Sequence, residues 1–153
     1  KTVTLIVESR QRFAVWCKED FCFWVDQTGL LFEPAPVSEG QLVQTVYDDS
    51  DSAASGRITL GSRVLGANEF DTISKILKSD LLRQISISSI KLSRSLQEVT
   101  ATTLSGTKII FSIRFDPETT ALPALAKFMA DPGLAKLQYV NLTVENRAFV
   151  KYR

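Results

Sequence analysis

The clearest fold signal in the sequence is FCFWVDQTGLLF, residues 21–32. Aromatic and β-branched residues fill both of its arms, and the four residues 26–29 (DQTG) between the arms are typical of a turn. A strand-like run, residues 13–17, and a polar turn, residues 18–20, come before it. We therefore expect the chain to open as a β-meander, which favours a binding module over a nucleotide-binding or catalytic loop.

The composition of the 153 residues indicates one domain, or one domain with a fragment of another. With 18 basic and 17 acidic residues the formal charge is +1, which argues against a nucleic-acid-binding surface. The chain contains no histidine, so Ser-His-Asp or Cys-His catalysis and histidine-ligated zinc are excluded. No apolar run approaches the ~20 residues that span a bilayer. Because Lys1 lies inside a strand pattern, we expect further chain to precede it.

The two cysteines, Cys17 and Cys22, flank the first turn. On a hairpin with this loop they can lie opposite each other, within reach of a disulfide. Opposition depends on the register of the two strands, so two small buried thiols are the alternative. Two cysteines alone make a poor metal site.

Alternation of apolar and polar residues predicts strands, and two apolar stripes at helical spacing predict helices over about 68–79 and 120–130. The expected strands are 2–9, 13–17, 21–25, 30–32, 41–47, 85–92, 98–104, 107–115, 138–144 and 148–152. Ser105-Gly106 predicts a two-residue hairpin turn, and the polar stretch 48–56 predicts a loop. The expected fold class is α+β, with a mainly antiparallel curved β-sheet and two helices packed on one face.

Several motifs, taken in order, resemble the FtsQ/DivIB family of bacterial cell-division proteins. They are VESR (7–10) with FAVW (13–16), FWVDQTGLLF (23–32), TLSGTKIIF (103–111), the helix over 122–129, and YVNLTVENRAFVKY (139–152). The first motif departs from the family, because Ser9 separates Glu8 from Arg10. In the last motif Asn141 and Thr143 replace the usual aspartate and arginine.

The resemblance implies a domain division and a function. Residues 1–12 would be the C-terminal strand of a POTRA domain, and residues 13–153 the β domain. The chain would be a non-catalytic scaffold of the divisome, on the extracytoplasmic face of the cell membrane at the division site. An N-terminal anchor outside this sequence would hold it there. The implied partners are small coiled-coil division proteins of the FtsB/DivIC and FtsL type. No cofactor, metal, nucleic acid or small-molecule substrate is expected.

In this family the last strand recruits the partner by β-strand addition, and the matching residues run from Arg147 to Arg153. Alternation puts the basic residues and Phe149 on one face of this strand, and Ala148, Val150 and Tyr152 on the other, toward the helices. The basic face could meet an acidic partner segment. Alternatively, the basic side chains only discourage aggregation at the edge. The expected partner-binding residues are Arg147, Phe149, Val150, Lys151, Tyr152 and Arg153.

Two other classes of function are alternatives to a division scaffold. A different binding module would be a POTRA-type chaperone, or a binder of cell-wall carbohydrate that uses Trp16, Trp24 and Tyr139 as stacking surfaces. A glycosidase would need paired carboxylates. The candidates, Asp26, Asp48, Asp49 and Asp116, all fall at predicted turns, where turn chemistry explains them.

Overall fold

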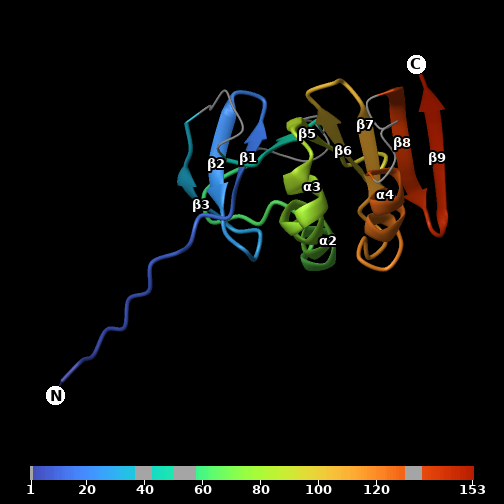
Figure 1. The fold of residues 1–153 in the computed structure, drawn as a ribbon. Helices are drawn as coiled ribbons and strands as arrows, with labels where there is room; N and C mark the ends of the chain where they lie inside the picture. Colours follow the sequence, from blue (N-terminus) through green and yellow to red (C-terminus); the bar gives the residue numbers. More distant parts are fainter. Residues whose placement is uncertain (1, 37–42, 50–57, 130–135) are drawn as a thin grey trace.

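The computed structural model describes residues 2–36, 43–49, 58–129 and 136–153. These residues form one nine-stranded sheet, in the order β3-β2-β1-β4-β5-β6-β7-β8-β9, and three helices (Figure 1). The strands are β1 (Ala14–Lys18), β2 (Phe21–Val25), β3 (Leu31–Pro34), β4 (Thr45–Asp48), β5 (Ile87–Ser93), β6 (Glu98–Thr103), β7 (Lys108–Ser112), β8 (Leu137–Val144) and β9 (Arg147–Tyr152). The helices are α2 (Ala67–Lys78), α3 (Asp80–Gln84) and α4 (Ala121–Met129).

The fold is α+β, as the sequence predicts, but the sheet is mixed rather than mainly antiparallel. The pairs β1–β4, β4–β5 and β7–β8 are parallel, and the other neighbouring pairs are antiparallel. Parallel neighbours need a crossover connection, and helices supply two of these. Helices α2 and α3 lie between β4 and β5 in the chain, and α4 lies between β7 and β8. Alternation along a strand indicates which residues are buried but not the direction of the strand. The parallel pairs could therefore not be predicted from the sequence pattern.

The main core lies between the sheet and the helices. Phe70, Ile73, Ile76 and Leu77 of α2 are buried there, on the stripe that the helical spacing predicts. The sheet contributes alternate residues of its strands, including the fully buried Phe111 of β7. All three helices pack their apolar residues into this one cluster. The opposite face of β5–β9, called the open face below, carries mostly polar and charged side chains.

The predicted strand over residues 2–9 is wrong. This segment is extended but pairs with nothing among the described residues, and Figure 1 shows it running away from the sheet. Val3, Leu5, Ile6 and Val7 are each more than four-fifths exposed. Alternation alone does not make a strand, because the backbone groups also need a neighbour to bond to.

Two other local predictions need correction. A third, short helix, α3, follows α2 directly, where the sequence suggested that the helix ends. The β6–β7 turn is wider than two residues, since its last register pair is Thr102 with Lys108 and Gly106 adopts φ +82°. The strand predicted over 41–47 corresponds to β4. Residues 41–42, most of the predicted loop over 48–56, and the end of the second predicted helix at 130 lie outside the described residues.

Candidate functional site

The last strand, β9, is the outermost strand of the sheet. It pairs with β8 on one side, and among the described residues no strand lies on its other side (Figure 1). The register with β8 includes the pairs Tyr139–Lys151, Val140–Val150 and Asn141–Phe149. An edge strand of this kind offers a row of backbone N–H and C=O groups to another chain.

The backbone hydrogen bonds identify which residues of β9 face outward. The N–H of Arg153 donates to the carbonyl oxygen of Lys136, at 3.0 Å, so the backbone of Arg153 faces β8. Successive residues of an antiparallel strand alternate in direction, so Lys151 and Phe149 face β8 as well. The intervening residues therefore turn their N–H and C=O groups to solvent. These outward residues are Ala148, Val150 and Tyr152.

The side chains of β9 divide between the two faces of the sheet. Ala148 and Val150 are half-buried and pack against the main core. Phe149 points to the open face and is 49% exposed. Tyr152 is 61% exposed, whereas the sequence pattern predicted that it packs on the helices. It is the last residue of the strand, opposite Leu137 where β8 begins, so little of the core extends beneath it.

The open face beside β9 is basic. Lys108 of β7, Tyr139 of β8 and Lys151 of β9 are register neighbours and form a row across three strands. Both lysines are exposed, and so is Arg147 at the other end of β9. The strands β7, β8 and β9 contain no aspartate or glutamate. The guanidinium of Arg153 donates to the carbonyl oxygen of Ser105, which anchors it over the β6–β7 turn.

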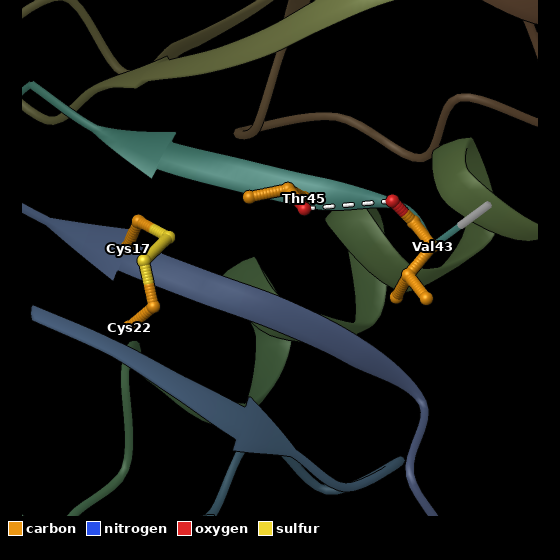
Figure 2. Close-up of a disulfide and its surroundings, with 4 residues drawn as sticks. All are labelled: Cys17, Cys22, Val43 and Thr45. Carbon is orange, nitrogen blue, oxygen red and sulfur yellow. Dashed lines mark hydrogen bonds between the residues drawn. A yellow bond between two sulfur atoms is a disulfide. The ribbon is translucent and has the colours of Figure 1, made fainter. Parts of the chain in front are cut away.

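The first hairpin is closed by a disulfide between Cys17 and Cys22, which are register partners of β1 and β2 (Figure 2). The bridge lies on the sheet face away from the helices, in a small apolar cluster with Val15. Trp24, Ala35 and Val43 pack against this cluster. Next to it, Thr45 Oγ1 donates to the carbonyl oxygen of Val43, at 3.4 Å. The cysteines are 2% and 7% exposed, so the disulfide is part of the interior.

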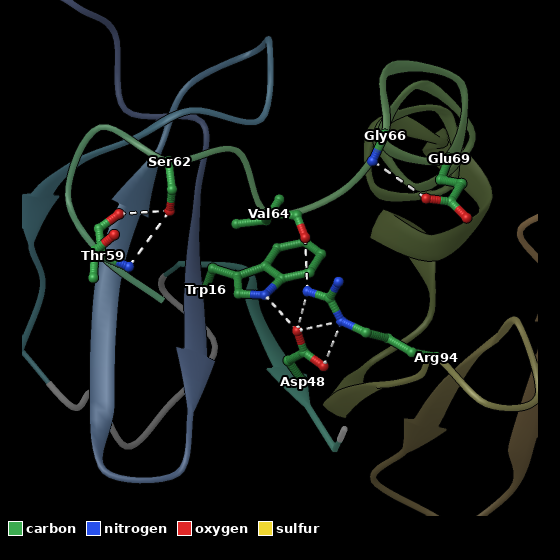
Figure 3. A network of polar contacts seen from close by, with 8 residues as sticks. All are labelled: Trp16, Asp48, Thr59, Ser62, Val64, Gly66, Glu69 and Arg94. Carbon is green, nitrogen blue, oxygen red and sulfur yellow. Dashed lines mark hydrogen bonds and ion pairs between the residues drawn. The ribbon is translucent and has the colours of Figure 1, made fainter. Parts of the chain in front are cut away.

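A buried polar network, which the sequence did not predict, joins the centre of the sheet to the segment before α2 (Figure 3). Asp48, at the end of β4, accepts hydrogen bonds from Arg94 and from Trp16 Nε1, the latter at 3.3 Å. Arg94 also donates to the carbonyl oxygen of Val64, at 2.6 Å. The available signal was that Asp48 follows the buried Val46 by two residues, which puts both on the core face of β4.

Near α2, two local contacts fix the entry to the helix. The Glu69 carboxylate accepts a hydrogen bond from the Gly66 N–H, at 3.2 Å, which satisfies a donor ahead of the first turn. Ser62 Oγ donates to the carbonyl oxygen of Thr59, at 2.6 Å, and so closes the preceding turn (Figure 3). Both contacts are structural.

Of the four carboxylates considered for catalysis, those of Asp26, Asp48 and Asp116 are engaged in structural contacts, and Asp49 is exposed. Asp26 Oδ1 accepts hydrogen bonds from Thr28 and from the Leu30 N–H, and Arg10 pairs with Oδ2. Burial alone would raise the pKa of Asp26, but the hydrogen bonds from Thr28, Leu30 and Arg10 outweigh it and lower the pKa to about 2. In Asp116 the pKa is lowered by the ammonium of Lys75, 2.8 Å away. Such carboxylates stay ionised and do not serve as general acids near neutral pH.

The described residues provide no cluster of three or more potential metal ligands. A recess of about 10 Å³ between α4 and the β8–β9 hairpin is lined by Ala124, Leu142 and Arg147, among others, and could hold roughly one water. Trp16 is fully buried and cannot stack on a sugar, while Trp24 is half-buried beneath the Arg12 guanidinium. Among the described residues, no helix has the length and apolar character needed to cross a membrane.

Comparison of the sequence with the models of known protein families and with curated proteins finds no match. The most distinctive surface of the chain is the edge of β9, where outward backbone groups, a half-exposed phenylalanine and basic side chains without an ion pair among the described residues lie together.

Proposed function

We propose that this chain is a non-catalytic docking module that binds another protein by adding one of that protein's strands to β9. The observation that carries the proposal is the position of β9 at the edge of the sheet, with the backbone groups of Ala148, Val150 and Tyr152 directed outward. Strand addition uses such groups for affinity and the flanking side chains for specificity. Phe149 supplies an apolar contact at the centre of the strand.

The resemblance to the FtsQ/DivIB family extends this proposal to a biological role. The chain would be an extracytoplasmic scaffold of the bacterial divisome that recruits proteins of the FtsB/DivIC and FtsL type. Residues 1–12 would end a POTRA domain and residues 13–153 would form the β domain. The segment over residues 3–7 is exposed, apolar and without a strand neighbour among the described residues, which supports its role as a strand that needs a neighbouring sheet.

A proline substitution tests strand addition directly. The N–H of Tyr152 faces outward, so Tyr152→Pro removes a donor from the docking edge without breaking the β8–β9 ladder. Tyr152→Ala is the matched control, because it removes the same side chain and keeps the N–H. The probe is the FtsB/DivIC-type protein of the same cell, and its Kd is measured by isothermal titration calorimetry.

We expect Tyr152→Pro to weaken binding about tenfold relative to Tyr152→Ala, because one backbone hydrogen bond is lost and the proline ring obstructs the added strand. The urea midpoints of both variants should stay near that of the parent chain. An equal Kd for the two variants, with the fold intact, would exclude docking at this edge.

A further inference from the structure

The basic residues of β9 and its neighbouring strands indicate which side chains a partner strand would have. On the open face, β9 presents Phe149 and Lys151, and Arg147 continues this alternation at the start of the strand, where it also borders the recess beside α4. Lys108 lies on β7, two strands from Lys151, and Tyr139 of β8 lies between them. Within the described residues neither Lys108, Lys151 nor Arg147 forms an ion pair, and the three strands contain no carboxylate. Among the described residues, the open face over β7, β8 and β9 is therefore positive.

A strand added to β9 would place its own side chains in register with these positions. Side chains directly opposite each other on neighbouring strands lie about 5 Å apart, so one face of the added strand would contact Lys151, Phe149 and Arg147 in turn. The other face would meet Ala148 and Val150, which are half-buried and apolar. The pattern that β9 offers is thus basic, apolar, basic on one face and small and apolar on the other.

We infer that the partner strand carries Glu or Asp at two positions four residues apart, i and i+4. The three positions between them, i+1 to i+3, are apolar. This inference rests on the proposed strand addition at β9. The pattern reads the same in both directions, so it holds whether the added strand runs parallel or antiparallel to β9. Each exposed ion pair contributes little affinity, but a lysine at either position would face an existing positive charge, which gives the edge its specificity.

The test uses two synthetic peptides of nine residues that differ only at the two charged positions. The first has the pattern Thr-Val-Glu-Val-Phe-Val-Glu-Val-Thr, and the second has Lys in place of both Glu residues. Each peptide is titrated into the isotopically labelled chain, and the amide NMR signals of Ala148, Val150 and Tyr152 report binding at the edge. We expect the Glu peptide to bind about tenfold more tightly at low salt, with a smaller advantage at high salt.

Charge reversal at Lys151 provides the decisive comparison. Lys151→Glu should abolish the preference for the Glu peptide, because one charged position of either peptide would then face a carboxylate and the other would still face Arg147. Lys91→Glu is the matched control, because Lys91 is exposed on the same face of the sheet but lies on β5, four strands from β9. This variant should leave the ranking of the two peptides unchanged.

The outcomes separate this inference from the proposed function. Equal affinities of the two peptides, with signal changes at Val150 and Tyr152, would overturn the acidic pattern and leave strand addition standing. Loss of the preference in Lys91→Glu as well as in Lys151→Glu would also overturn it, because the effect would then reflect net charge alone. If neither peptide perturbs the β9 amides and Tyr152→Pro has no effect on the cellular partner, both the inference and the proposed function fail.

Discussion

Asp48 and Arg94 form an ion pair in which the carboxylate is completely buried, with 2.6 Å between Arg94 Nη2 and Asp48 Oδ2. The pair joins the end of β4 to the turn after β5, and through Val64 it also holds the segment that leads into α2. It lies on the helix-covered face of the sheet, beside the indole of Trp16. The position of the helices on the sheet therefore depends on a polar contact as well as on apolar packing.

Removal of the Asp48 carboxylate should strongly destabilise the fold. Asp48→Ala leaves the Arg94 guanidinium partly buried without its counter-charge and leaves Trp16 Nε1 without its acceptor. Loss of one partner of a buried pair costs about 3 kcal/mol. Asp49→Ala is the control, since Asp49 is the next residue and is exposed. Urea unfolding measures both variants, and equal losses of stability would show that the buried pair contributes nothing beyond surface charge.

The turn carboxylate of Asp26 should make stability depend on pH under acidic conditions. Its pKa is about 2 in the folded chain and about 4 in an unfolded chain. The folded value is the lower one, so the stabilisation is fully present above about pH 4 and is lost as the pH falls toward 2. The side chain is 8% exposed, and the two pKa values correspond to about 2 kcal/mol.

Asp26→Asn tests this expectation, because it removes the charge and keeps a side-chain acceptor for the turn. The free energy of unfolding of the variant should change less than that of the parent chain between pH 4 and pH 2. Asp20→Asn, at an exposed position, should follow the parent chain. Parallel curves for Asp26→Asn and the parent chain would mean that Asp26 titrates with an ordinary pKa in the folded state.

The sequence predicts this fold well where each element carries its own local signal. The alternating apolar residues of β7 and the stripe of α2 identify their buried faces without reference to the rest of the chain. The errors arise where the structure depends on a distant neighbour. Residues 2–9 alternate like a strand but have no neighbouring strand among the described residues, and the parallel direction of β4 beside β5 follows from the crossover through α2 and α3.

The candidate site shows the same difference between features that are local in sequence and features that depend on distant residues. The alternation of Arg147, Phe149 and Lys151 is visible in the sequence, because it is local to one strand. The row that links Lys108 to Lys151 through Tyr139 depends on a parallel pairing with β7, which no local pattern encodes. The ion pair of Asp48 was missed for a similar reason. Its partner, Arg94, lies 46 residues away and is recruited by the packing of β4 against β5.

The disulfide should stabilise the chain by a modest amount. It closes a loop with a sequence separation of only five residues, for which the loss of unfolded-state entropy corresponds to about 2 kcal/mol. The double variant Cys17→Ala/Cys22→Ala should therefore have a lower urea midpoint than the oxidised parent chain. A reducing agent should lower the midpoint of the parent chain and leave that of the double variant unchanged. A parent chain whose midpoint does not respond to reductant after complete thiol release would contradict this prediction.

Two glycines with nearly the same backbone geometry should differ in how well they tolerate a side chain. Gly29 has φ +81° and Gly61 has φ +82°, so alanine at either position is strained by about 1 kcal/mol. At Gly29 a Cβ atom would also lie 2.9 Å from Cγ of Phe70, whereas at Gly61 it would meet nothing within 4 Å. The ring of Phe70 is held in the core by contacts with Phe13 and Trp16, so it cannot move away freely.

Gly29→Ala should consequently destabilise the fold by at least about 1 kcal/mol more than Gly61→Ala, because overpacking adds to the backbone strain. Urea unfolding of the two variants measures the difference directly, since the backbone contribution is common to both. Adding Phe70→Leu to Gly29→Ala should reduce the extra penalty, because the smaller side chain removes the aromatic ring from the contact. If the two alanine variants unfold at the same urea concentration, the β2–β3 turn does not press against α2 as closely as this geometry requires.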